Sequence, residues 1–279
     1  MNKKRHRKRV IPGFGLSMGV TLAMLSLIVL IPIASIFVSA SGLSFNEFIK
    51  VVTARDVMSG YQVSLSCALT AALINCVFGV ILAWILVRYE FPGKGVLDGL
   101  IELPFALPTA VAGIALTSLY SDKGWIGHAF AQIGISIAYT KIGITIAMVF
   151  IGIPFVVRAI QPVLEKLDKQ YEEASHMLGA SGKRTFFRVI FPEIFPAMLT
   201  GFGLALARGI GEYGSVVFIA GNIPYETQIA PLLIMSKLEQ FKYQDATAVA
   251  LVLLVISFVL LLLINAVQVH MSKITSTSH

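Results

Sequence analysis

The sequence predicts an all-α, polytopic membrane protein with six transmembrane helices. Only 13% of the 279 residues are charged and 56% are hydrophobic, whereas about 25% of the residues in a soluble domain are charged. The chain also holds six apolar stretches close to the ~20 residues that a spanning helix needs. These stretches are 14–38, 61–87, 99–120, 142–160, 197–221 and 246–269.

The six stretches form one predicted membrane domain, 14–272, between a basic N-terminal segment, 1–13, and a short tail, 273–279. The basic start followed by an apolar run resembles a signal peptide. The apolar core of a signal peptide is only ~7–15 residues long, and 14–38 is longer. Because further spans follow, we expect this first segment to stay in the protein as a helix.

The third and fourth stretches contain prolines, at Pro104 and Pro108 in one and at Pro154 in the other. Proline lacks the backbone N–H and its ring crowds the preceding turn, so it bends a helix. We therefore expect each of these stretches to form a kinked span.

The distribution of Lys and Arg sets the orientation. With the N-terminus inside, the internal segments carry 15 of these residues and the external segments carry 6. Cytoplasmic loops are the ones enriched in Lys and Arg, which predicts that both termini are cytoplasmic. The six external cations are Lys50, Arg55, Lys123, Lys141, Lys237 and Lys242.

The connection between the fourth and fifth stretches, about 161–196, reads as two short helices. Asp168 is a favourable N-cap, and Glu172 and Glu173 follow in the first turn, where the helix dipole favours anions. Gly179 supplies a C-terminal stop. The helix between these signals has a face of low polarity with helical spacing. That face is Tyr171, Ala174, Ser175 and Leu178.

A second helix is expected to begin at Ser181 and to end before Pro192. A loop of about 35 residues is too small to bury apolar side chains in a core of its own. Its apolar residues therefore need the membrane bundle or another protein. A simple linker at the membrane interface stays open as the alternative.

This connection resembles the EAA loop of binding-protein-dependent ABC importer permeases. That motif is Glu-Ala-Ala, three residues, Gly, nine residues, then Ile-x-Leu-Pro. Here Glu173-Ala174-Ser175 precede Gly179 and the run 189–192, Val-Ile-Phe-Pro, at the same spacing. In the family the loop docks into a separate ATPase subunit. The resemblance implies that the docking element comprises Glu172, Glu173, Ala174, Ser175, Gly179 and Pro192.

Further runs resemble the T-type permeases of sulfate/thiosulfate ABC importers. They are 88–93, 103–113, 153–158 with 161–165, 211–214 and 218–222. The resemblance implies a type I ABC importer permease fold in the inner membrane of a bacterium, and transport of sulfate or thiosulfate. A molybdate or tungstate permease is the alternative, and an ATPase-independent secondary anion transporter is a more distant one.

The same resemblance implies the partners. They are two ATPase subunits that bind ATP and Mg, a second permease of the W type and an extracytoplasmic binding protein. Membrane lipid surrounds the spans. The chain itself is then expected to hold no cofactor and to be no enzyme.

Two charged residues, Arg208 and Glu212, lie in the fifth stretch with i, i+4 spacing. A charge at the centre of a bilayer costs about 2.5–3.5 kcal/mol on insertion scales, and pairing on one helix face offsets part of that cost. One interpretation is a structural ion pair. The other is that the pair lines or gates an anion path, to which Thr109 is a further candidate, because the guanidinium fork matches a tetrahedral oxyanion.

Several chemistries find no support in the sequence. The run Gly182-Lys183 lacks the remaining residues of a phosphate-binding loop, so we expect the energy source on another polypeptide. The histidines are scattered, which predicts no metal site. The basic charges lie between apolar runs instead of on one soluble face, so nucleic acid is not an expected partner.

Overall fold

The computed structural model describes the backbone of residues 14–276 and the side chains up to Val269. The predicted basic segment 1–13 lies outside the described residues, as does 277–279 of the predicted tail. The described part of the chain consists of helices and their connections, with no strand. In order they are α1 Phe14–Leu25, η1 Ser26–Leu30, α2 Ile31–Ala40, α3 Phe45–Val52, α4 Arg55–Arg88, α5 Lys94–Ala106, α6 Thr109–Tyr120, α7 Trp125–Ala131, α8 Lys141–Lys166, α9 Lys169–Met177, α10 Gly182–Thr185, η2 Phe186–Ile190, α11 Phe191–Ile210, α12 Val216–Ile219, α13 Ala230–Glu239 and α14 Tyr243–Ser276.

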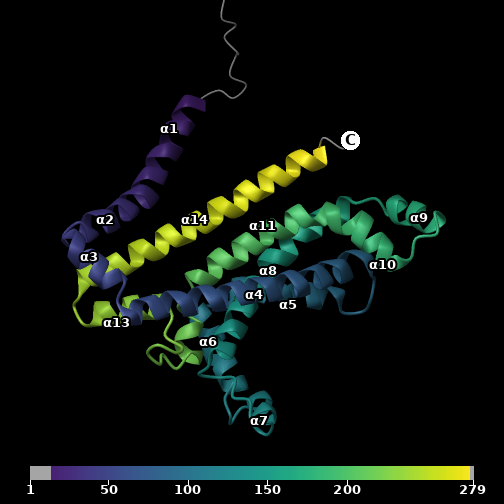
Figure 1. Ribbon diagram of the computed structural model, residues 1–279. Coiled ribbons are helices and arrows are strands. Elements are labelled where there is room, and N and C mark those ends of the chain that lie inside the picture. Colours follow the sequence, from purple (N-terminus) through teal and green to yellow (C-terminus); the bar gives the residue numbers. More distant parts are fainter. Residues whose placement is uncertain (1–13, 277–279) are drawn as a thin grey trace, which may run out of the picture.

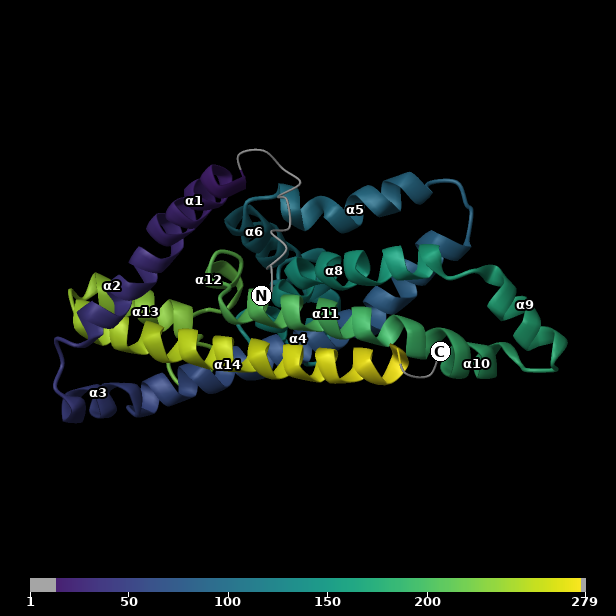
Figure 2. The same ribbon diagram turned by 90° about the horizontal axis from the view of Figure 1, so that it is seen from above.

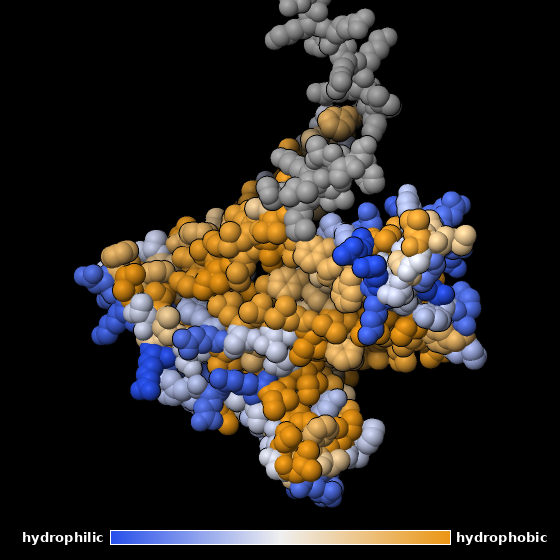
Figure 3. Space-filling view, turned by 45° about the vertical axis from the view of Figure 1, so that its right-hand side comes forward, coloured by the Kyte–Doolittle hydropathy of each residue, from blue (hydrophilic) through white to orange (hydrophobic). Residues whose placement is uncertain are grey.

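Five helical segments are long and apolar enough to cross a membrane, and a sixth crossing results if α5 and α6 together count as one span. Figure 3 shows the hydrophobic band that they form, with hydrophilic side chains gathered toward its two ends. The prediction of an all-helical, polytopic protein is confirmed. The five segments are Phe14–Ala40, Arg55–Arg88, Lys141–Lys166, Gly182–Ile210 and Tyr243–Val269.

The core lies where α4, α8 and α11 pack side by side, with α14 along α11 (Figures 1 and 2). Glycines allow the close approach. A Cβ added at Gly201 of α11 would stand 2.6 Å from the Cα of Val156 in α8. Without a hydrophobic driving force in lipid, such van der Waals contacts between small residues hold membrane helices together. By contrast, α1 stands apart from the bundle and buries no residue.

The third span was predicted to be a single kinked helix, and this prediction is wrong. It is broken into α5 and α6, which turn by 115° relative to each other. Leu107, at the break, has φ −84° and ψ 134°. Pro108 explains this extended backbone, because a proline disfavours the helical conformation in the residue before it.

The fourth span is longer than predicted. One helix, α8, runs through Pro154 and Pro162 to Lys166, so the connection after it begins at Leu167 and not at 161. The sixth span, α14, likewise continues into the predicted tail as far as Ser276.

The sequence predicted that the second helix of the connection ends before Pro192. This prediction is wrong, because the helix extends past Pro192. It continues through the π-helical turn η2 into α11, and Pro192 lies in the first turn of α11. The same arrangement recurs where η1 precedes Pro32 in α2. In both cases a wider turn accommodates the missing N–H and the bulky ring of the proline that follows. The fifth span also ends early, at Ile210 instead of 221.

Candidate functional site

The helix α9 projects beyond one end of the bundle (Figure 2). Its boundaries follow the local signals in the sequence. The Asp168 side chain accepts a hydrogen bond from the backbone N–H of Gln170 at 3.0 Å. At the other end Gly179 adopts φ +79°, a left-handed conformation that glycine reaches without steric cost. The chain can therefore reverse and enter α10.

An ion pair holds α9 to the bundle. The guanidinium of Arg88, at the end of α4, lies 2.7 Å from the carboxylate of Glu172 and donates to the carbonyl of Leu167 at 3.1 Å. The Arg88 side chain is only 9% exposed and its guanidinium stands over the ring of Trp84, 5.7 Å from the centroid. Glu172 therefore faces the bundle. No local signal in the sequence connected Arg88 with Glu172.

A second contact joins α9 to α10. The hydroxyl groups of Ser175 and Thr185 lie 3.0 Å apart, within hydrogen-bond distance. Thr185 is buried and Ser175 is half-buried. Ser175 therefore contacts α10.

The outer side of α9 exposes several large apolar side chains. Tyr171 is 59% exposed, Met177 89% and Leu178 88%, and Glu173 and Ala174 between them are exposed as well. We call this set of five residues the α9 face. Exposed apolar side chains outside the membrane bundle make this face a candidate interaction site. Pro192 is exposed too, but it lies in α11 and outside this face.

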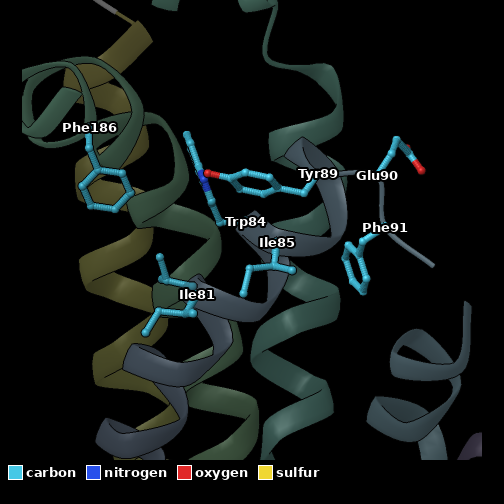
Figure 4. A pocket seen from close by; sticks show the side chains of 8 residues that line it. Ile81, Trp84, Ile85, Tyr89, Glu90, Phe91 and Phe186 are labelled. Carbon is cyan, nitrogen blue, oxygen red and sulfur yellow. The ribbon is translucent and has the colours of Figure 1, made fainter. Parts of the chain in front are cut away.

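An open pocket of about 520 Å³ adjoins the base of this element (Figure 4). The Trp84 ring packs edge-on against Phe186, with their centroids 5.8 Å apart. Trp84 also underlies Arg88, so it links the pocket to the ion pair that holds α9. The lining is mostly apolar: Val80, Ile81, Trp84, Ile85, Tyr89, Glu90, Phe91 and Phe186.

A second candidate site is the turn after α11. Arg208 and Glu212 form the predicted ion pair, but not in the middle of a span: Arg208 lies in the last turn of α11 and Glu212 just beyond its end. Glu212 is only 1% exposed. Its other oxygen accepts from the backbone N–H of Ser215 at 2.8 Å and from the Ser215 hydroxyl at 2.9 Å.

Thr109 lies against the same turn. A Cβ added at Gly214 would come within 2.1 Å of the Thr109 hydroxyl oxygen. One turn further along α6, a Cβ at Gly113 would come within 2.4 Å of the Ser215 carbonyl oxygen. The structure therefore places Thr109 and the Arg208–Glu212 pair around the same turn. The Arg208 side chain keeps 35% of its surface exposed.

A third cluster escaped the sequence analysis. Arg158 of α8 lies 2.8 Å from Asp98 and 2.8 Å from Glu102, both in α5. The two carboxylates lie one turn apart on one face of α5. This i, i+4 spacing is visible in the sequence and could have indicated a partner cation. Only the fold brings Arg158 between them. The cluster fixes α5 beside α8.

No group of three or more metal-ligating side chains occurs among the residues that the structure describes. The candidate sites are instead one projecting helix face with exposed apolar side chains and one ion pair with a buried carboxylate beside a broken helix. A broken helix and charged residues inside a membrane bundle are features of transport proteins. This fold and these sites define a membrane transport component.

Comparison with known proteins identifies the family. The family of binding-protein-dependent transport system inner membrane components matches residues 75–275, and this chain belongs to it. It is a permease component of the inner membrane and not itself catalytic.

Several relatives match over almost their whole length. The sulfate transport system permease protein CysT of Salmonella typhimurium is 47% identical, and the alignment covers 94% of each chain. The CysT protein of Escherichia coli is 46% identical over the same shares. A probable sulfate transport system permease protein of Nephroselmis olivacea is 49% identical, covering 91% of this chain and 89% of the relative.

Solved structures share the fold. A chain of a bacterial ABC transporter that imports the acidic polysaccharide alginate superposes with a TM-score of 0.75 at 14% identity, over 92% of this chain and 96% of that one. A chain of an amino acid ABC transporter reaches 0.56 at 18% identity, over 82% and 99%.

Proposed function

We propose that this chain is the permease subunit of an ATP-driven importer of sulfate and thiosulfate. The observation that carries the proposal is the similarity, over about nine-tenths of the chain, to permeases named for sulfate transport. The partly exposed Arg208 side chain agrees with it, because the planar fork of donors on a guanidinium matches a tetrahedral oxyanion.

The proposed assembly contains two ATPase subunits carrying ATP and Mg, a second permease of the W type and an extracytoplasmic binding protein. This chain contributes six crossings, with α5 and α6 as one broken span and both termini cytoplasmic. The α9 end of the bundle is then the cytoplasmic end. The distribution of Lys and Arg supports this orientation.

The α9 face is the proposed contact with an ATPase. It offers exposed apolar side chains for a partner groove, while Arg88 and Glu172 join its inner side to α4. Movement of the ATPases would shift α9, and the ion pair would pass that movement to α4 as a rigid element. Such small shifts at an interface can switch a packed bundle between two arrangements.

The Arg208–Glu212 pair, with Thr109 beside it, is the proposed element of the anion path. The break between α5 and α6 places the start of α6 against this turn. In the proposed mechanism a passing oxyanion competes with Glu212 for the Arg208 guanidinium. The bond from Ser215 keeps the Glu212 carboxylate in position when Arg208 turns away.

The test is uptake of radiolabelled sulfate by the complete complex in proteoliposomes. We expect uptake that requires ATP and falls when thiosulfate competes, and that molybdate affects little. Arg208→Gln should lower it at least tenfold, while the control Lys123→Gln leaves it unchanged. Uptake without ATPase subunits, or stronger competition by molybdate than by thiosulfate, would contradict the proposed function.

A further inference from the structure

The end of the bundle opposite α9 carries an open pocket of about 420 Å³ that is lined by both polar and apolar side chains. It lies between the N-terminal half of α4, the start of α8 and the loop before α13. Its size is in the range of small-molecule sites. The residues that line it are Ser59, Gln62, Val63, Leu65, Ser66, Leu69, Lys141 and Tyr225.

The pocket is positively charged. Lys141 lines it directly, and the guanidinium of Arg55 stands 5.6 Å from the centroid of the Tyr225 ring. Within the described part of the chain neither cation forms an ion pair. Cations at this end of a span oppose the usual distribution of Lys and Arg in the proposed orientation, so two uncompensated ones around one pocket indicate a use.

The pocket wall is held in place before any ligand binds. Tyr225 has φ +67°, a left-handed conformation that a bulky residue keeps only where its surroundings impose it. Its carbonyl accepts from the Ser59 hydroxyl of α4 at 2.8 Å. Two residues earlier, the N–H of Ile223 donates to the Thr227 hydroxyl at 3.0 Å. A preformed wall lowers the entropic cost of binding.

We propose that this pocket binds a tetrahedral oxyanion, either free sulfate or phosphate or the phosphate of a lipid headgroup. The Lys141 ammonium supplies the charge, the Gln62 amide supplies further donors, and Arg55 adds a second cation at the rim. Charged donors to an anionic oxygen make strong hydrogen bonds. The site deepens the proposed function, on which the choice of sulfate as a probe and the orientation of this end of the bundle rest.

The first experiment measures equilibrium binding of radiolabelled sulfate, and separately of inorganic phosphate, to the complete complex in phosphatidylcholine nanodiscs without ATP or binding protein. Lys141→Gln should weaken the binding of either anion about tenfold, the effect of losing one charge-assisted hydrogen bond. Lys141→Arg should keep binding within about threefold, because it retains a cationic donor. The matched control is Lys242→Gln, an exposed lysine of the same end.

A second measurement identifies the source of the oxyanion. Phospholipid retained by the delipidated complex is counted by mass spectrometry for the wild type, Lys141→Gln and Lys242→Gln. Specific loss of retained lipid in Lys141→Gln, without free anion binding, assigns the site to a headgroup phosphate. If neither anion binding nor lipid retention differs between wild type and an assembled Lys141→Gln complex, the proposal is overturned. If the wild-type complex binds the anion but takes up no sulfate, the proposed function is rejected and the proposal for this pocket is not.

Discussion

The two candidate sites are built in opposite ways. The turn after α11 places Glu212 at 1% exposure and uses both of its oxygens, on Arg208 and on Ser215. The helix α9 turns Met177 and Leu178 outward at 89% and 88% exposure. The polar groups of the α11 turn bind one another, whereas the apolar side chains of the α9 face are exposed.

This difference predicts that the α11 turn contributes to the stability of the protein and that the α9 face contributes to its interactions. Removing a group from the α11 turn leaves a partner unpaired inside the bundle, so it should destabilise the protein itself. Changing the α9 face removes nothing from the fold, so it should affect only assembly and transport. The two regions are therefore distinguished by measuring unfolding and uptake on the same variants.

The largest effect is expected for Glu212→Ala. It leaves Arg208 and the Ser215 N–H without their acceptor, and breaking a buried pair in this way costs about 3–5 kcal/mol. We expect about 3 kcal/mol, since Arg208 is partly exposed and can turn toward water. Denaturant unfolding of the purified permease measures it.

The control for this variant is Glu239→Ala, which alters an exposed glutamate at the end of α13. It should stay within about 0.5 kcal/mol of the wild type. Equal unfolding free energies for the two variants would mean that the Arg208–Glu212 pair does not stabilise the bundle.

Local signals predicted one region better than the other. Both ends of α9 follow from Asp168 and Gly179, because a cap acts within a few residues. The Arg88–Glu172 pair joins residues far apart in sequence, so no local signal reveals it. Pro108 indicated a disturbance of the third span, but the 115° turn depends on how α6 packs against Ser215.

The early end of the fifth span was hidden for a related reason. The apolar run continues past Ile210 through the short helix α12, Val216–Ile219. Hydropathy alone therefore cannot separate α11 from the turn that follows. The glycines at 209, 211 and 214 weaken the helix there, and Glu212 binds Ser215 instead of extending the helix. The prediction that Arg208 and Glu212 form an ion pair was thus correct, but the pair lies at the end of α11 and not within the span.

The next largest effect is expected for Leu178→Glu on the α9 face. A side chain 88% exposed contributes little to the fold, so unfolding should change by no more than about 0.5 kcal/mol. If Leu178 inserts into an ATPase groove, a buried charge there costs about 2 kcal/mol of binding, roughly thirtyfold. Binding of the ATPase subunit to the purified permease measures this directly.

Leu178→Met is the matched control, because it preserves an apolar side chain of similar volume. It should bind the ATPase like the wild type. If Leu178→Glu also binds normally and supports full uptake, the α9 face is not the contact surface.

A smaller effect is expected for Arg88→Met, which removes the ion pair beneath α9 but keeps an unbranched apolar side chain over Trp84. Amide exchange across Lys169–Met177 should accelerate about tenfold, since local opening loses about 1.4 kcal/mol of protection. The bundle helices should keep their protection. Arg184→Met, which alters an exposed cation of the same connection, should leave α9 unchanged, and equal exchange in both variants would rule out Arg88 as the anchor.

The smallest effect is expected for Lys94→Gln. Lys94 and Glu90 repeat the i, i+4 spacing of Arg208 and Glu212, with 2.7 Å between the charged atoms. Glu90, however, is 88% exposed, and water and salt screen such a pair to about 0.3–0.5 kcal/mol. At low and at high salt, the unfolding free energies of Lys94→Gln and the wild type should therefore differ by less than this amount. A loss above about 1 kcal/mol would show that burial does not explain the contrast with Glu212, and that the connection before α5 is itself a structural anchor.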